Sequence, residues 1–190
     1  MKKIIIILLI ILITGCDLFT NRDPEDPDAA RSNYLPATTL DVLFSNLKNS
    51  LQEKVLENYM ASFIDPSFIS LPFIFIPSSE AVVKFPSLVD WNLSAERQYF
   101  NNLINTTKQS TPIILDLQNE IKNTTGDSAV FQYDYTLTLS STNENIPSVY
   151  KGNVKFYVFL DSRNQWAIGR WEDIKIGNDP SWSELKGALY

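Results

Sequence analysis

The fold class is decided by residues 131–139, FQYDYTLTL, in which apolar and polar side chains alternate without a break. A period of two is typical of a β-strand that packs one face on a core and turns the other toward solvent. The same alternation recurs over residues 113–121, 154–160 and 166–174, with polar connections between them. These connections are short enough for hairpins, so the sequence predicts an antiparallel meander of four strands.

The last predicted strand carries an irregularity at Gly169. Apolar residues are three apart from Ile168 to Trp171, which interrupts the period of two at the glycine between them. A glycine at such an interruption indicates a β-bulge. We expect Trp166 and Trp171, on either side of the bulge, to be buried in the core; the alternative is that they stack on a ligand.

Upstream of the meander the apolar residues recur every three or four positions, which predicts helices. One long amphipathic helix is expected from a capping box at Thr38 to about Ala61. A second helix is expected to begin with Ser94 as its cap.

Two shorter elements complete the pattern. Residues 73–76 are apolar and bounded by prolines, which suits an edge strand. A final helical turn is expected after the meander, capped by Asp179 or Ser181 and ended by Gly187. Helices followed by a long antiparallel sheet indicate an α+β domain.

The N-terminus is typical of a bacterial export signal. Two lysines precede an apolar run over residues 4–13, which is too short to span a bilayer. Residues 13–16, ITGC, resemble a bacterial lipobox. The resemblance implies that signal peptidase II removes residues 1–15 and that lipid on Cys16 anchors the protein to a bilayer in the bacterial cell envelope, facing the periplasm or the cell surface. The alternatives are an ordinary signal peptide and an uncleaved anchor.

The remaining chain divides into a tether and one domain. Residues 16–36 are rich in Asp, Glu and Pro and have no apolar period, so we expect a solvated linker. Residues 37–190 carry all the predicted helices and strands, and we expect them to form a single α+β domain.

The composition excludes several chemistries. The chain has 190 residues, no His and one Cys, with a formal net charge of −6. Without His, neither Ser-His-Asp nor Cys-His catalysis is available, and one Cys allows no thiolate zinc site. The chain contains no phosphate loop or dinucleotide fingerprint, and we expect no cofactor and no metal. The acidic balance argues against nucleic acid as a partner, because phosphates bind to basic surfaces.

Four segments resemble the nuclear transport factor 2-like (NTF2-like) superfamily, which includes ketosteroid isomerase and the SnoaL-type cyclases. They are residues 59–66, 73–76, 96–103 and 166–173. The resemblance implies a cystatin-like cone, in which a strongly bent sheet curls round the helices and leaves a cavity. Aromatic side chains on the helical and sheet faces that meet there are candidates to line a pocket for a small apolar ligand; the alternative is that they form the core. They are Tyr59, Phe73, Phe75, Tyr99, Phe100, Tyr133, Tyr135 and Phe156.

The superfamily's isomerases use a carboxylate base and an oxyanion hole made of a Tyr and a protonated Asp. Asp116 and Asp134 are the nearest candidates on the predicted sheet, but both fall on the polar phase of their strands. We therefore expect both to face solvent, and no catalytic residue is assigned.

Three functions remain. The preferred one is a membrane-tethered, non-enzymatic module that binds a small apolar molecule or a partner protein. The second is a cavity enzyme of isomerase, cyclase or dehydratase type that uses a carboxylate or a Tyr, and an inward-facing Asp beside a Tyr would favour it. The third is a structural homodimer that pairs through the open face of the sheet, and a dry core with a broad apolar outer sheet face would favour it.

Overall fold

The computed structural model describes residues 32–190, which pack as one unit. The predicted signal peptide, the predicted lipidation site Cys16 and most of the predicted linker lie outside the described residues. Within the described part of the chain, no helix is long and apolar enough to cross a membrane. The domain is α+β, as predicted, with most of its helices preceding the long strands of the sheet.

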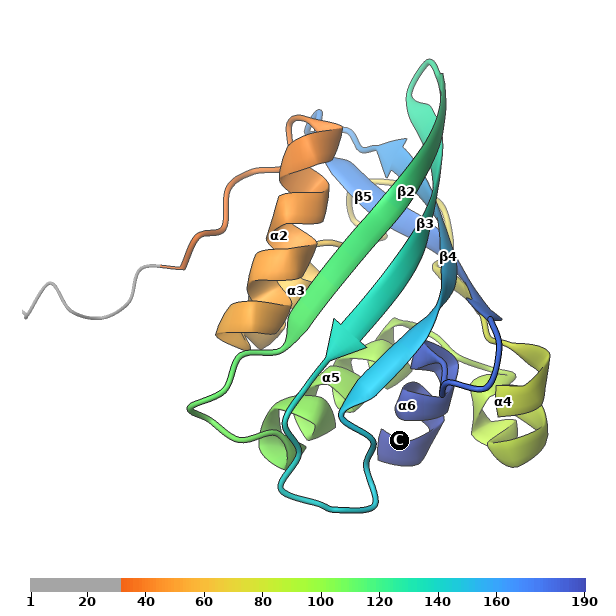
Figure 1. The fold of residues 1–190 in the computed structure, drawn as a ribbon. Helices are drawn as coiled ribbons and strands as arrows, with labels where there is room; N and C mark the ends of the chain where they lie inside the picture. Colours follow the sequence, from red (N-terminus) through yellow and green to blue (C-terminus); the bar gives the residue numbers. More distant parts are fainter. Residues whose placement is uncertain (1–31) are drawn as a thin grey trace, which may run out of the picture. The chain divides into compact units, whose positions relative to one another are not determined.

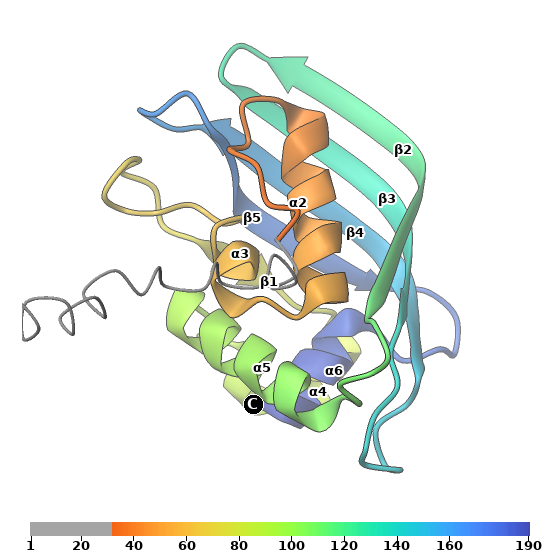
Figure 2. The same ribbon diagram turned by 90° about the vertical axis from the view of Figure 1, so that its left-hand side faces the viewer.

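The sheet contains the predicted meander of four strands (Figure 1) and the predicted edge strand (Figure 2). Its strands are β1 (Ile74–Ile76), β2 (Ile114–Thr125), β3 (Ser128–Thr138), β4 (Val149–Leu160) and β5 (Trp166–Lys175). The order across the sheet is β1-β5-β4-β3-β2. Strands β2 to β5 pair antiparallel with their neighbours, and β1 adds to the free edge of β5 in parallel.

The helices lie on one side of this curled sheet. They are α2 (Leu40–Glu53), α3 (Leu56–Met60), α4 (Ser79–Lys84), the 3₁₀ turn η1 (Pro86–Leu88), α5 (Leu93–Thr106) and α6 (Trp182–Leu189). In Figure 2 the sheet curls around α2, and α4, α5 and α6 are grouped at one end of the curl. The core therefore lies between the helices and the inner face of the sheet, where aromatic side chains gather.

Two bulges bend the long strands. Tyr157 of β4 pairs with Arg170 while the next residue pairs with Ile168, so Gly169 is the extra residue, as predicted. A second bulge lies in β2 between Gln118 and Ile121 and was not predicted. It shifts the alternation by one residue, and Ile121, expected on the inner face, is 65% exposed.

The long first helix predicted to reach Ala61 is in fact two helices. Lys54 adopts a left-handed backbone with a φ of 57°, and its N–H bonds back to carbonyls of the preceding turn, which ends α2. The cap of α2 is Thr39 rather than Thr38, because the Thr39 hydroxyl accepts the backbone N–H of Val42 at 3.3 Å.

The caps of the two later helices were predicted with mixed success. Asn92, not Ser94, caps α5, since its side-chain oxygen accepts the backbone N–H groups of Ser94 and Ala95, the second and third residues of that helix. Ser181 caps α6, as predicted, in a reciprocal capping box with Glu184.

Helix α4 was not predicted, and the predicted end of α6 at Gly187 is wrong. Gly187 lies inside α6. A Cβ atom at this position would lie 2.4 Å from the ring of Phe85, so the glycine serves close packing rather than helix termination. Of the two tryptophans expected in the core, Trp171 is fully buried, whereas Trp166, at the start of β5, is only half-buried.

Candidate functional site

The eight aromatic side chains predicted to line a pocket pack into the core instead of surrounding one common hollow. Seven are buried, and Phe73 is half-buried. Tyr59 stacks on Phe100 with ring centres 3.8 Å apart, and Phe156 lies 5.3 Å from Trp171. Tyr133 alone of the eight lines one of the surface hollows described for this domain, beside α2.

Helix α6 places a further indole in the space where the cavity was expected. Trp182 is fully buried and meets Trp171 edge-on, with ring centres 4.6 Å apart. Its indole N–H donates to the hydroxyl of Tyr99 on α5 at 2.8 Å. Trp182 therefore links the sheet to α5 through the interior of the curl. The sequence had predicted only that Trp182 lies in a short final helical turn.

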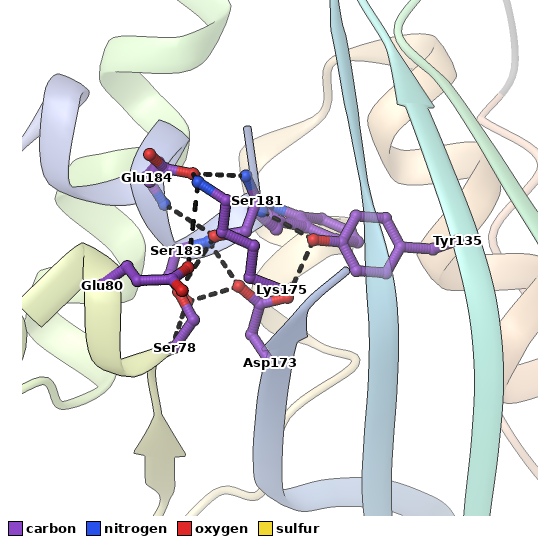
Figure 3. Close-up of polar contacts among 9 residues, drawn as sticks. Ser78, Glu80, Tyr135, Asp173, Lys175, Ser181, Ser183 and Glu184 are labelled. Carbon is purple, nitrogen blue, oxygen red and sulfur yellow. Dashed lines mark hydrogen bonds and ion pairs between the residues drawn. The ribbon is translucent and has the colours of Figure 1, made fainter. Parts of the chain in front are cut away.

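The first turn of α6 is held by a group of polar side chains, which we call the α6 cap cluster (Figure 3). The backbone N–H of Trp182 donates to the Tyr135 hydroxyl at 2.7 Å, and that of Ser183 donates to Asp173 at 2.7 Å. Ser181 and Glu184 exchange the two bonds of the capping box. The free N–H groups that begin any helix are thus satisfied by side chains here. The cluster consists of Tyr135, Asp173, Ser181, Ser183 and Glu184.

Asp173 is the centre of this cluster. It is 3% exposed, and it accepts the Tyr135 hydroxyl at 2.8 Å as well as the Ser183 hydroxyl. Burial raises the pKa of the Asp173 carboxyl, against the opposing effect of its hydrogen bonds from Ser183 and Tyr135. Asp173 also borders a surface hollow of about 300 Å³ that Ser78 and Lys175 help to line. An inward-facing Asp beside a Tyr is the arrangement that would favour an enzyme.

Sequence reasoning missed Asp173 although a signal was present. Trp171 was predicted to point inward, and a period of two beyond the bulge places Asp173 on the same face. Asp116 and Asp134, which were considered instead, lie on the outer side. Asp116 is exposed, and Asp134 is half-buried and accepts side-chain N–H groups of Asn119 and Asn153.

A second buried polar group joins α5 to α6. Glu96 and Lys186 are both 0% exposed and form an ion pair in which the ammonium contacts both carboxylate oxygens. Glu96 also accepts the Tyr59 hydroxyl at 2.5 Å and the Trp91 indole N–H at 2.6 Å. Burial lowers the pKa of Lys186 to about 8, because desolvation of the ammonium exceeds the attraction of Glu96.

Glu96 was not singled out from the sequence. A signal was again available, since Glu96 stands three and four residues before Tyr99 and Phe100 and so shares their apolar stripe. Burial raises the pKa of Tyr59 and of Tyr99 well above the usual value.

The largest hollow described on the domain lies outside the core, between α3 and the start of α5. This outer cleft has a volume of about 500 Å³. Two ion pairs lie beside it: Arg97 with Glu57 at 2.6 Å, and Arg163 with Asp161 at 2.6 Å. The cleft is lined by Tyr34, Glu57, Met60, Ala61, Phe63, Ile64, Asp65, Pro66, Leu93, Ser94, Arg97 and Arg163. Within residues 32–190, no group of three or more Asp, Glu, Cys or His side chains could hold a metal ion.

Comparison with known proteins identifies the fold. No protein-family model matches the chain, and no curated protein matches it in sequence. A provisionally assigned aromatic ring hydroxylase from Novosphingobium aromaticivorans superposes with a TM-score of 0.57 at 10% identity, over 80% of this chain and 96% of that one. A provisionally assigned dehydratase of the NTF2-like family from Streptomyces avermitilis gives a TM-score of 0.55 at 8% identity, over 75% and 96% of the two chains.

An NTF2-like protein of unknown function from Pseudomonas putida is similar to the same degree. Its TM-score is 0.52 at 9% identity, over 75% of this chain and 87% of that one. At such low identities the similarity concerns the fold alone. The domain therefore has the cone fold of NTF2-like proteins, as the sequence resemblance predicted.

Proposed function

We propose that this protein, whose domain has the NTF2-like fold, is a lipid-anchored binding module without a catalytic centre. The observation that carries the proposal is the state of the cone interior. Trp182 and Lys186 of α6 fill it, and each carboxylate inside it already has internal partners. The ligand or partner protein is therefore bound from outside, in the outer cleft.

The buried carboxylates are poorly placed for catalysis. A general base has to reach the proton that it removes, directly or through one water. Glu96 accepts bonds from Tyr59, Trp91 and Lys186 in the core. The hydrogen bonds of Asp173 fix the first turn of α6. Both carboxylates are thus already engaged inside the domain, and neither is free to remove a proton from a substrate.

The outer cleft has the properties of a binding site. Its volume lies within the range of about 300–1,000 Å³ that is usual for small-molecule sites. Met60, Phe63 and Leu93 offer apolar contact, while Arg97 and Arg163 offer cationic groups. Both guanidinium groups are already paired, with Glu57 and Asp161, so the cleft suits a molecule with an apolar body and a polar group that can join these ion pairs.

The cleft also lies next to the place where the tether joins the domain. Tyr34, two residues after the first described residue, lines it. With Cys16 acylated, a flexible linker of this length reaches roughly 20 Å, so the cleft would stay near the membrane surface. The anchor is tested by labelling with palmitate: Cys16→Ser is expected to remain unlabelled and uncleaved, and a labelled, mature-sized variant would contradict the lipoprotein proposal.

The binding site is tested with anilinonaphthalene sulfonate, a dye with an apolar body and one anionic group. A soluble form that begins at Ser32 is expected to bind the dye. Met60→Glu is expected to weaken binding roughly tenfold, equivalent to ~1.4 kcal/mol, because it replaces an apolar contact by a charge of the same sign as the sulfonate. Val83→Glu is the matched control, because Val83 is 85% exposed and does not line the cleft. Equal dye binding by Met60→Glu and the control would exclude the outer cleft.

A second candidate function is a cavity enzyme, which the Asp173–Tyr135 contact and the raised pKa of Asp173 favour. Two of the similar structures are provisionally assigned as a hydroxylase and a dehydratase. The test is proton removal from 5-nitrobenzisoxazole, a substrate that responds to a carboxylate base in an apolar site. We expect no rate above that of free acetate. If the rate is faster and Asp173→Asn abolishes it, the protein is an enzyme and the binding-module proposal is wrong.

A further inference from the structure

The ammonium of Lys186 is enclosed by aromatic rings. Its Nζ atom lies 3.9 Å from the ring centre of Trp171, 4.5 Å from that of Phe75, 4.9 Å from that of Tyr99 and 5.4 Å from that of Trp91. All four rings are at most 5% exposed. Together with Glu96, which contacts the ammonium with both oxygens, these four rings form what we call the ammonium cage.

Such a cage is a means of recognising a cation. Aromatic faces attract an ammonium within about 6 Å of the ring centre, and the attraction is strongest where water is excluded. The carboxylate of Glu96 supplies the opposite charge. The cage therefore contains the elements that proteins use to bind organic ammonium ions, and a residue of the same chain occupies it.

The cage is not required for packing α6 against the core. Replacing a buried ion pair by apolar side chains of similar volume is often neutral or stabilising, because both charges lose their hydration on burial. Trp182 and Leu185 already fix α6 with fully buried apolar side chains. The packing of α6 alone therefore does not account for a buried Lys that faces four rings and a carboxylate.

The two ends of α6 are held differently. Its first turn is fastened by Tyr135 and Asp173 through backbone N–H groups. Its last turn packs Gly187 directly against Phe85, and the carbonyl of Leu189 accepts the side-chain N–H of Asn102 on α5 at 2.7 Å. To withdraw Lys186, the last turn has to leave Phe85 and Asn102, while the α6 cap cluster keeps the first turn in place.

We propose that the ammonium cage is a binding site for a primary alkylammonium ion, and that Lys186 is the internal occupant which such a ligand displaces. The ligand is a primary rather than a quaternary ammonium, because 3.9 Å from Nζ to the Trp171 ring is close to van der Waals contact and leaves no space for an N-methyl group. The indole N–H of Trp171 has no hydrogen-bond partner among the described residues, so a ligand oxygen near the ammonium would gain a donor. This site is separate from the outer cleft.

The first test removes the internal occupant. Lys186→Ala leaves the cage with its carboxylate but without a cation, and n-butylammonium has the head and stem of the missing side chain. At ten times its dissociation constant the amine is expected to raise the melting temperature of this variant by about 3 °C. Butan-1-ol and tetramethylammonium are expected to have no such effect, and neither is butylammonium on the matched control Lys175→Ala, whose ammonium is part-exposed beside Glu184.

The second test uses the unaltered full chain and stays informative if Lys186→Ala does not fold. Saturating n-butylammonium is expected to speed hydrogen exchange at the amides of Leu189 and Tyr190, in the last turn, and to leave the Ser183 amide protected by Asp173. Its affinity for the native chain should be roughly tenfold or more below that for Lys186→Ala, since the internal cation competes. Unchanged exchange in the native chain, or equal rescue of Lys186→Ala by butan-1-ol, would overturn the proposal.

Discussion

The domain buries two carboxylates beneath the same helix, and it treats them differently. Asp173 is held by neutral donors, the hydroxyl of Tyr135 and the backbone N–H and hydroxyl of Ser183. Glu96 is held by neutral donors and, in addition, by the ammonium of Lys186. The first carboxylate satisfies backbone groups at a helix start, which any helix requires. Glu96 is paired with a charge that the packing of α6 does not require. Asp173 therefore belongs to a structural site, and Glu96 belongs to a candidate ligand site.

Trp171 lies between the two sites, and its loss should have the largest effect. Its ring contacts the ammonium of Lys186 at 3.9 Å and the indole of Trp182 at 4.6 Å. Because Trp171 is fully buried, Trp171→Ala is expected to lower the free energy of unfolding by about 5 kcal/mol, the upper end for a buried aromatic side chain. Chemical denaturation of the domain measures this loss. An unchanged midpoint would mean that Trp171 is exposed and available to bind a ligand.

Lys186→Ala should have the next largest effect, because it leaves the Glu96 charge buried without its partner. Removing one member of a buried ion pair typically costs ~3–5 kcal/mol. We expect about 3 kcal/mol, since Glu96 keeps its donors from Tyr59 and Trp91. Denaturation of Lys186→Ala and of Glu96→Gln/Lys186→Met compares the charged and neutral cages. The double variant should recover most of the loss, and equal losses would show that side-chain volume, not charge, matters here.

Asp173→Asn should cost less, about 2 kcal/mol, because the change removes no packing volume. An Asn side chain presents one acceptor oxygen where Asp173 presents two, so a donor from Tyr135 or Ser183 is left unsatisfied in the core. The variant is also expected to expose the amides of the first turn of α6 to hydrogen exchange. If exchange there stays slow, the α6 cap cluster does not fasten the helix.

The contrast between the two sites also explains what could be predicted from the sequence. The meander and the Gly169 bulge were predicted because alternation and its interruption are local properties of a strand. Asp173 and Glu96 each share an apolar phase with residues that were identified as core, so their burial was encoded locally too. Their partners were not, because Lys186 lies 90 residues from Glu96 and Tyr135 lies 38 residues from Asp173.

The failures in local structure have a common physical origin. Lys54 and Asn119 adopt positive φ values without being glycine, so no glycine marked the end of α2 or the bulge in β2, although Asn is enriched in this conformation. For a different reason, the position of α6 could not be predicted. The sequence indicated many inward aromatic side chains but not that Trp182 and Lys186 would be inserted among them from a helix after the sheet.

The last comparison concerns how the stability contributed by the two sites responds to pH, with a slope of at most about 1.4 kcal/mol per pH unit for each proton. Burial raises the pKa of Asp173, so above pH 3.8 the folded chain binds more protons than the unfolded chain at this residue. The stability that Asp173 contributes is therefore complete below pH 3.8 and falls as pH rises through its raised pKa. Burial lowers the pKa of Lys186 to about 8 from 10.5, so between these values the unfolded chain binds more protons.

The contribution of Lys186 consequently has the opposite sign: it is complete above pH 10.5 and is lost as pH falls through about 8. The two contributions are separated by measuring the free energy of unfolding of the native chain, Asp173→Asn and Lys186→Met over a range of pH. As pH rises from 8 to 10.5, the stability of the native chain should increase relative to that of Lys186→Met. As pH rises from 3.8, its stability should decrease relative to that of Asp173→Asn. Because Asp173 also lies close enough to raise the pKa of Lys186, the alkaline gain should be larger in an Asp173→Asn background. A gain that is the same in both backgrounds would show that the two sites beneath α6 are electrostatically independent.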